Sequence, residues 1–445
     1  MIETNLYSEI LRKDQAYIWH PFTPLVGSEP PLPIVKAEGA YLYTEDGQKI
    51  LDAIASWWVN LHGHSHPHIA KAIFEQAQKL EHVIFAGFTH EPAVKLAERL
   101  LAILPSNQSK VFFSDNGSTA CEVAIKMALQ YWYNLGKTQR TEIIALQGAY
   151  HGDTFGGMSV AERNLFNKPF LEKLFEVHFL PFPACYEVAC CAGKRNNAQC
   201  FSAKVTIQKM QELAETGKIA AFIYEPLVQG AAGMRMYSPE ILDELLNIAH
   251  KYDILCIADE VMTGFGRTGK LFASEYCTQK PDIMCLSKGI TGGTMPLGAT
   301  TCTEKVISAF RSAEKSKTFY HGHSYTANPL ACAAANASLD LLLQKQTLQK
   351  IHQITEMHIA FEAQIRSQKR VAKVQTLGTI LALELKSKEE TSYFNNMAKD
   401  IYKHFLAKNI LLRPLGNVLY VMPPYCIEKN ELEWVYREIS SFLES

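Results

Sequence analysis

Short apolar runs alternate with longer stretches of helical spacing over most of the chain, from about residue 65 to 310. The clearest runs are residues 111–113, 142–146, 220–224 and 254–258, and polar or glycine residues follow each of them. A strand followed by a helix, repeated along a chain, is typical of a mostly parallel sheet covered by helices. The pattern therefore predicts an α/β fold, in which ligands bind beyond the carboxyl ends of the strands.

Two further segments depart from this alternation. Near the N-terminus, Asp46-Gly47 separates the runs 41–43 and 49–51, and Asp-Gly between two such runs predicts a β-hairpin. Toward the C-terminus, a small-residue helix over 330–343 leads to an apolar run at 419–424 and a closing helix from Glu431. The second segment predicts a smaller α+β unit after the parallel sheet.

The composition limits the classes of function. The 445 residues are enough for about two or three domains, and a net charge of −1 gives no reason to expect nucleic acid or an anionic membrane as partner. No run approaches the roughly 20 apolar residues of a membrane span, and residues 1–19 mix charges with no apolar signal segment. The 11 cysteines, an odd number without disulfide-scaffold spacing, favour a reducing, cytoplasmic compartment.

Two segments resemble metal sites only superficially. Residues 184–205 hold the clustered cysteines but lack the paired C-x-x-C spacing of a zinc site. Alternating histidines over 62–68 have no carboxylate or cysteine beside them, and Pro67 predicts the first turn of a helix. We therefore expect a surface insertion at 184–205 and no metal at either place. The clustered cysteines are Cys185, Cys190, Cys191 and Cys200.

Lys288 and Asp259 carry the most informative chemistry in the chain. Lys288 follows an apolar run and precedes the glycine-rich stretch 289–293, and Asp259 ends the run 254–258. A pyridoxal phosphate (PLP) enzyme needs such a pair: the amine forms a Schiff base with the cofactor, and the carboxylate keeps the pyridine nitrogen protonated. Taken singly, a solvated lysine and a turn-capping aspartate are the more ordinary explanations, so the prediction depends on finding the rest of a PLP site.

A phosphate site is predicted where the run 111–113 leads into a helix. Gly117 would let a phosphate approach the backbone, Ser118 or Thr119 fits the N-cap, and Glu122 supplies an acid in the first turn. Free amides and the positive end of the helix dipole make such a terminus an anion site. A plain capped helix explains this segment equally well when it is taken alone.

Aromatic and basic residues supply candidates for the rest of a pocket. Tyr150, in the glycine-flanked loop 148–153, could stack on a planar cofactor or pack on its own domain. Trp57 and Trp58 could wall a pocket for an aliphatic chain or join core and interface. Arg413, at the end of an apolar run, suits a substrate carboxylate, although a surface arginine is the simpler explanation.

Together these residues resemble the class III aminotransferases of PLP fold type I, and the resemblance covers nearly the whole chain. Its most specific part is Asp259-Glu260-Val261, followed by Gly-Phe-Gly-Arg-Thr-Gly at 264–269 and then by Lys288. The resemblance implies an aspartate aminotransferase-like fold with PLP as cofactor. It also implies a large PLP-binding domain over 61–328, a smaller α+β domain made of 1–60 and 329–445, and a homodimer with shared active sites.

Within that class the chain is similar to the branch that aminates 8-amino-7-oxononanoate in biotin biosynthesis. The markers include Trp-His-Pro-Phe-Thr at 19–23, Trp57-Trp58, and Arg-Pro-Leu-Gly at 413–416. The implied reaction is a ping-pong transamination that yields 7,8-diaminononanoate. Aminotransferases for ornithine, 4-aminobutyrate or polyamines share the fold and Lys288, as does a PLP aminomutase, and these alternatives stay open.

The amino donor also stays open at this point. Residues 321–326, His-Gly-His-Ser-Tyr-Thr, resemble a branch that uses lysine, whereas Trp57-Trp58 resemble the branch that uses S-adenosylmethionine. We favour S-adenosylmethionine, because adjacent aromatic rings suit an adenine and a sulfonium cation. Phe22 stands where some members have tyrosine, so a hydroxyl is missing at the substrate mouth.

The resemblance implies a role for each candidate residue. Lys288 is the Schiff-base lysine and proton shuttle, Asp259 pairs with the pyridine nitrogen, and Tyr150 lies near the ring. Gly117 and Ser118 hold the phosphate, together with His323 and Ser324 of the partner subunit. Substrate contacts come from Phe22, Trp57, Trp58, Tyr150, Gly322 and Arg413, with Arg413 on the substrate carboxylate.

Overall fold

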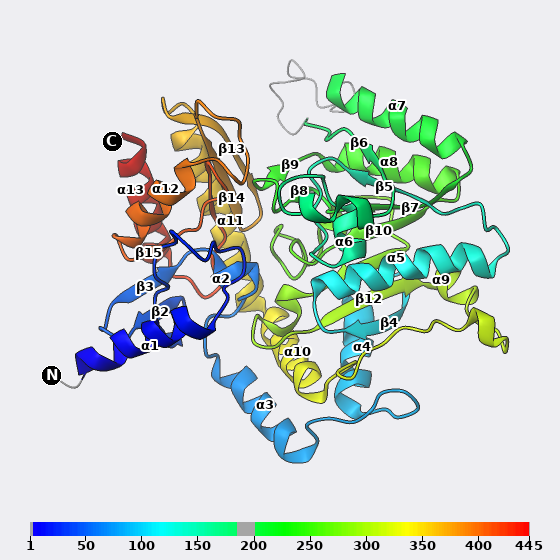
Figure 1. Ribbon diagram of the computed structural model, residues 1–445, viewed down its shortest axis with the longest axis horizontal. Helices are drawn as coiled ribbons and strands as arrows, with labels where there is room; N and C mark the ends of the chain where they lie inside the picture. The colour runs from blue at the N-terminus through cyan, green and yellow to red at the C-terminus, as the bar shows by residue number, and fades with distance from the viewer. Residues whose placement is uncertain (1–2, 185–200, 445) are drawn as a thin grey trace.

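The computed structural model describes residues 3–184 and 201–444 and is built around one large sheet (Figure 1). Its strand order is β4-β12-β11-β10-β7-β5-β6. β12 runs antiparallel to both of its neighbours, and the other four pairs are parallel. The predicted mostly parallel sheet is therefore confirmed. The strands are β4 (Gln108–Ser114), β5 (Glu142–Leu146), β6 (His178–Leu180), β7 (Ile219–Tyr224), β10 (Leu255–Asp259), β11 (Ile283–Leu286) and β12 (Gly298–Thr303).

Alternate residues of the central strands enter two separate cores. Ile223 and Ile257 pack with residues of α5 on one face, whereas Phe222 and Cys256 pack with residues of α7 and α8 on the other. Because both faces are covered, successive strand positions are apolar. This explains why the sequence shows unbroken apolar runs there. The helices around the sheet are α4 (Glu91–Ile103), α5 (Gly117–Asn134), α6 (Phe155–Val160), α7 (Phe201–Glu215), α8 (Pro239–Lys251) and α9 (Glu304–Ser308).

The two ends of the chain meet in a second part of the molecule, on the left of Figure 1. β1 (Ile34–Glu38), β2 (Tyr41–Thr44) and β3 (Lys49–Asp52) form a sheet with β15 (Ile410–Leu411). The β2–β3 pair is antiparallel, which confirms the hairpin predicted at Asp46-Gly47. The parallel β3–β15 pairing supports the union of residues 1–60 with 329–445, and these domain limits stay a prediction.

A three-stranded antiparallel sheet, in the order β13-β14-β16, completes this part. The predicted small-residue helix, hairpin-flanking strands and closing helix are all present. A further short pair, β8 (Val228–Gln229) with β9 (Arg235–Met236), lies in the loop after β7. The remaining elements are α1 (Glu3–Tyr17), α2 (Ala55–Trp58), α3 (Pro67–Lys79), α10 (Pro329–Leu342), α11 (Lys345–Ile365), α12 (Met397–Leu406), α13 (Lys429–Glu444), β13 (Val371–Leu377), β14 (Ile380–Leu385) and β16 (Val418–Val421).

Arg267 joins three segments that lie far apart in the sequence. Its side chain is buried, and its guanidinium donates to the carbonyl oxygens of Asn60 and Pro423, each at 2.9 Å, and to that of Trp58 at 3.4 Å. Three carbonyl partners in the interior would each lose a hydrogen bond without this side chain. Arg267 therefore holds the segment that carries Trp58 against the C-terminal part of the chain.

Two sequence predictions concerned a membrane span and the cysteine-rich segment. No helix in 3–184 or 201–444 combines the length and the apolar character that crossing a membrane requires. Residues 185–200, which hold all four of the clustered cysteines, lie outside the described residues, but the expected insertion is wrong at 201–205, because these residues begin α7 and Ala203 is buried in the core. The cysteines of the described ranges are free thiols.

Candidate active site

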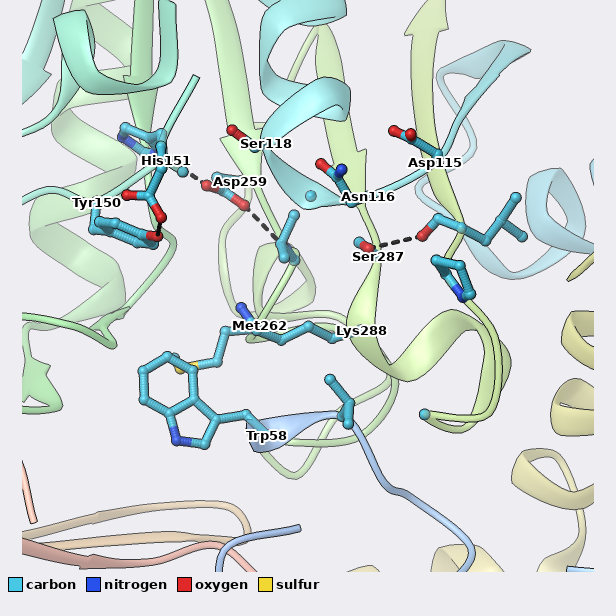
Figure 2. Close-up of a pocket in the computed structure, with 18 of the residues that line it drawn as sticks. Trp58, Asp115, Asn116, Ser118, Tyr150, His151, Asp259, Met262, Ser287 and Lys288 are labelled. Atoms are coloured by element: carbon cyan, nitrogen blue, oxygen red, sulfur yellow. Dashed lines mark hydrogen bonds and ion pairs between the residues drawn. The ribbon is translucent and has the colours of Figure 1, made fainter. Parts of the chain in front are cut away.

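A cavity of about 740 Å³ lies beyond the carboxyl ends of the central strands, where the sequence pattern predicts a ligand. Its walls come from the start of α5, the loop after β5, the end of β10 and the residues after β11. Figure 2 shows these side chains converging on one space. Of the predicted site residues, the cavity brings together Gly117, Ser118, Tyr150, Asp259, Lys288 and Trp58.

The N-terminus of α5 opens on this cavity, but its cap differs from the prediction. The side chain of Asn116 accepts a hydrogen bond from the Thr119 amide at 2.9 Å, and the Thr119 hydroxyl accepts one from the Asn116 amide at 3.1 Å. Placing Ser118 or Thr119 at the N-cap was wrong, because the helix already begins at Gly117. Glu122 consequently lies beyond the first turn, where it accepts the backbone amides that open α6.

This helix terminus can bind an anion. The amides of Gly117 and Ser118 are the first two of the helix, and they donate to no acceptor in the described parts of the chain. The hydroxyls of Ser118 and Thr154 lie 2.9 Å apart on the cavity wall. A Cβ at position 117 would stand 2.6 Å from the side chain of Val261, so glycine lets the helix start pack beside the end of β10. Free amides and two hydroxyls at a helix N-terminus are a phosphate site.

Asp259 is held by hydrogen bonds from three directions. Its Oδ2 accepts from His151 Nδ1 at 2.7 Å and from the Cys121 thiol at 3.4 Å, and its Oδ1 accepts from the Val261 amide at 3.1 Å. Burial by itself lowers the pKa of His151, but the hydrogen bond to Asp259 and the charge of that carboxylate outweigh it and raise that pKa to about 10. The protein therefore holds a positively charged imidazole against this carboxylate at neutral pH.

Lys288 follows β11 and opens a short 3₁₀ turn, Lys288–Thr291. Its backbone φ of +42° is unusual for a residue with a side chain, a kind of strain that clusters at functional sites. Its side-chain nitrogen Nζ lies 5.2 Å from the centre of the Trp58 ring. Burial lowers the pKa of Lys288, although Asp259 and Glu225 oppose the effect. The site thus favours the neutral amine, which is the form that can accept a proton.

Tyr150 and Glu225 form the part of the cavity wall that follows β5 and β7. The Tyr150 hydroxyl donates to Asp153 Oδ2 at 2.9 Å, and its amide donates to Glu225 Oε1 at 3.1 Å. Burial raises the pKa of Tyr150, with Asp153 adding to the effect, so this side chain keeps its proton. Burial also raises the pKa of the Glu225 carboxyl to about 7. Glu225 can therefore change its charge close to neutral pH, at the edge of the cavity.

Phe22, Trp57 and Arg413 form a second cluster, beside the cavity rather than on its wall. The Arg413 guanidinium lies 4.7 Å from the centre of the Trp57 ring, and the Phe22 and Trp57 rings meet edge-on at 5.6 Å. Trp58, the next residue, lines the cavity and donates from Nε1 to the Tyr420 hydroxyl at 2.9 Å. Of the two adjacent tryptophans, Trp58 therefore lines the cavity and Trp57 belongs to the cluster next to it.

Gly322, His323 and Ser324 are not brought to this cavity in the same chain. They lie in a loop before α10, in which the Tyr325 ring is 65% exposed. His323 Nδ1 accepts the Tyr325 amide at 3.2 Å, while His323 Nε2 is buried and has no partner among the described residues. The structure of one chain therefore leaves these three residues with no visible role.

The residues of the cavity fit PLP. The free amides at the start of α5, with Ser118 and Thr154, match the cofactor's phosphate. A carboxylate, Asp259, and an amine, Lys288, line the same space and match its ring nitrogen and its aldehyde. Each part of the cofactor thus has a partner of suitable chemistry, and the partners come from separate strand ends and a helix start.

Comparison with known proteins identifies the class to which this site belongs. The family Aminotransferase class-III matches residues 25–443, and the chain belongs to this family. It is an aminotransferase of the PLP fold type I architecture, and PLP is its cofactor. The resemblance seen in the sequence is therefore confirmed for the family, the fold and the cofactor.

The chain is also similar to individual relatives over nearly its whole length. The chain is 47% identical to the adenosylmethionine-8-amino-7-oxononanoate aminotransferase of Synechococcus elongatus over 430 residues, which cover 96% of this chain and 98% of that protein. The crystal structure of the enzyme with the same name from Methanocaldococcus jannaschii is 34% identical, with a TM-score of 0.90 and coverage of 98% and 99%. A PLP-bound amine transaminase from an uncultivated Pseudomonas species is 30% identical, with a TM-score of 0.88 and coverage of 95% and 97%.

Four side chains of the site escaped the sequence reasoning: Cys121, His151, Thr154 and Glu225. Glu225 directly follows β7, so the same strand-end rule that found Asp259 would have found it. Cys121 lies four residues after Gly117 on α5, the spacing that places two residues on one helix face. His151 lies within the Tyr150 loop and Thr154 directly follows it, but neither was selected as a site residue, because their partners Asp259 and Ser118 come from other elements.

Proposed function

We propose that this protein transfers an amino group from S-adenosylmethionine to 8-amino-7-oxononanoate, which gives 7,8-diaminononanoate for biotin biosynthesis. The names of the full-length relatives support both substrates. The observation that carries the proposal is the position of Arg413, stacked on Trp57 beside the residue that lines the Lys288 cavity. An aliphatic substrate with a terminal carboxylate could reach Arg413 along Trp57 while its other end stays near Lys288.

The described residues can be assigned to the steps of such a transfer. When bound, PLP supplies an electron-withdrawing ring that stabilises negative charge at the donor's α-carbon. Burial lowers the pKa of Lys288, which favours the free amine; its Nζ would take the α-proton from the donor in one half-reaction and give a proton to the acceptor carbon in the other. Asp259, backed by the charged His151, keeps the ring nitrogen protonated. Gly117, Ser118 and Thr154 anchor the phosphate.

The pocket residues have separate parts in this proposal. Tyr150 would form a wall beside the cofactor ring, and the Trp58 ring lies 5.2 Å from Lys288 Nζ. Phe22 and Trp57 guide the aliphatic chain toward Arg413, which binds the carboxylate. Phe22 and Trp57 are 44% and 40% exposed, so a bound aliphatic chain would cover apolar surface that now faces solvent.

We also propose that the enzyme works as a homodimer in the cytoplasm. His323 and Ser324 would then reach the phosphate of the partner subunit, and Gly322 would contact substrate there. The exposed loop and the unpartnered Nε2 of His323 support this assignment. The free thiols of the described cysteines suit a reducing compartment.

Single-turnover spectroscopy of the PLP-loaded enzyme tests the proposed reaction. S-adenosylmethionine should bleach the visible absorbance of the bound cofactor, and 8-amino-7-oxononanoate should then restore it. Lysine, ornithine and 4-aminobutyrate are tested in parallel as donors. If only lysine bleaches the cofactor, the amino donor is lysine and not S-adenosylmethionine. If ornithine or 4-aminobutyrate bleaches it and 8-amino-7-oxononanoate does not restore the absorbance, the proposed amino acceptor is wrong. Lys288→Ala is the control, because it should show neither change.

A further inference from the structure

A second cavity, of about 430 Å³, adjoins the one that contains Lys288. Both cavities are lined by Tyr150, Gly152, Asp153 and Ala231, so they meet at the loop after β5. The outer walls of the second cavity come from residues 162–167 of the large-sheet part and from residues 390–394 of the C-terminal part. A substrate bound near Lys288 can therefore extend an arm into this side chamber.

The chamber is lined by four carboxylates and one arginine, so its walls carry a net negative charge. Asp153, Glu162, Glu384 and Glu390 all line it, and none of the four forms an ion pair with another described residue. Among the described residues, the carboxylates of Asp153 and Glu384 accept hydrogen bonds from one hydroxyl group each, those of Tyr150 at 2.9 Å and Thr391 at 2.7 Å. Four such groups around one cavity attract a cation and repel a substrate carboxylate.

One arginine, Arg235, also lines the chamber; its Nε has no hydrogen-bond partner among the described residues, and its charge interacts with that of Glu162. Arg235 donates to the carbonyl of Gln147 at 3.1 Å and to the side-chain oxygen of Gln229 at 2.7 Å. Its guanidinium also stacks on Phe182 at 4.3 Å. Arg413, which suits a carboxylate, belongs to the Trp57 cluster and does not line this chamber.

Aromatic rings close the outer end of the chamber. The Phe166 ring meets those of Tyr393 at 4.9 Å and Phe394 at 5.0 Å, and all three line the cavity. Phe166 also touches Phe22, edge-on at 5.7 Å, and Phe22 continues to Trp57. Rings of this kind can stack on a planar base and can contact a cation through their faces.

We propose that this side chamber, lined by Glu162, Glu390 and Phe166, binds the sulfonium and adenosine of S-adenosylmethionine while its amino group reacts at Lys288. The inference rests on the proposed function and assigns the two substrates to different arms of the site. The cationic, aromatic donor takes the acidic chamber, and the anionic tail of 8-amino-7-oxononanoate takes the arm that leads to Arg413. The two half-reactions of one active site should therefore respond to different mutations.

The test measures the two half-reactions of the holoenzyme separately, by the absorbance of the bound cofactor. The variant is the double substitution Glu162→Gln and Glu390→Gln, since neither side chain makes a hydrogen bond or ion pair with another described residue. We expect the concentration of S-adenosylmethionine for half-maximal rate to rise about tenfold and the maximal rate to stay the same. The corresponding concentration for 8-amino-7-oxononanoate should be unchanged. Glu172→Gln, an exposed residue of the neighbouring turn, is the matched control and should alter neither.

Two further measurements sharpen the result. Phe394→Leu should weaken the binding of S-adenosylmethionine but not that of 8-amino-7-oxononanoate, because Phe394 lines the chamber, its ring contacts are with Phe166 and Tyr393, and only the donor carries a base to stack. Raising the salt concentration should weaken donor binding in the wild type and have less effect in the double variant. Unchanged donor affinity in the double variant, or equal losses in both half-reactions, would overturn the inference. A wild-type enzyme that does not react with S-adenosylmethionine would overturn the proposed donor as well, and that failure is visible before any variant is compared.

Discussion

Burial and close neighbours set the charge of three side chains in the site. Burial lowers the pKa of the Lys288 amine and raises the pKa of the Glu225 carboxyl, since poorly polar surroundings disfavour either charge. His151 responds differently, because the carboxylate of Asp259 lies only 2.7 Å from its Nδ1. One charged pair, His151 with Asp259, therefore persists beside a lysine that tends toward neutrality.

Replacing His151 by asparagine should make the stability of the apo protein less dependent on pH above neutrality. Folding raises the pKa of His151 from 6.5 to about 10, so its contribution is complete below about pH 6.5 and is lost as the pH rises through about 10. We expect the free energy of unfolding of the wild type to exceed that of the variant by on the order of a few kcal/mol near pH 7. That margin should narrow steadily toward pH 10. Urea unfolding at several pH values measures it, and a margin independent of pH would contradict the charge assigned to His151.

At the scale of secondary-structure elements, the sequence predicts what depends on local pattern and misses what depends on distant contacts. The strands that end at Asp259 and before Lys288 were predictable because their buried faces make continuous apolar runs. The cap of α5 was not, since Asn116, Ser118 and Thr119 all belong to residue types that cap helices well. The start of this helix packs on Val261, which lies far away in the sequence, and no local signal reveals that contact.

Gly152→Ala should weaken PLP binding by about tenfold or more, because the loop after β5 touches the phosphate-binding start of α5. Gly152 has a φ of +104°, and an added Cβ would lie 2.2 Å from the Ser118 hydroxyl and 2.8 Å from its Cα. Ser118 would have to move away from the site that we assign to the phosphate. The dissociation constant of PLP, measured by fluorescence titration of the apo protein, gives the result.

Gly136→Ala is the matched control for this loop. Gly136 has a φ of +74° but open space around an added Cβ, so it reproduces the backbone strain without the clash. Both substitutions should cost about 1 kcal/mol of stability through strain, and only Gly152→Ala should change the affinity for PLP. Equal PLP affinities in the two variants would show that the position of Ser118 does not determine phosphate binding.

At the scale of the whole molecule, the site is assembled from segments that the sequence keeps far apart. Trp58 comes from the N-terminal part, its partner Tyr420 from the C-terminal part, and the buried Arg267 binds backbone from both. The sequence suggested this union only through family resemblance, because no periodicity links residues so distant. The loop of Gly322, His323 and Ser324 is the one group of predicted site residues that does not line the Lys288 cavity of its own chain or pack beside it.

Heterodimers provide the test of that loop. Lys288→Ala removes the essential amine, and Ser324→Glu places a negative charge where we propose that a partner's phosphate lies, so each homodimer should be inactive or nearly so. If Ser324 acts in the partner subunit, a heterodimer of the two variants contains one intact site, made of Lys288 from one chain and Ser324 from the other. Dimers purified through two different tags should then show about half of the wild-type activity. If Ser324 acts within its own chain, both sites of the heterodimer are damaged and activity stays absent, whereas a control heterodimer of Lys288→Ala with wild type retains about half.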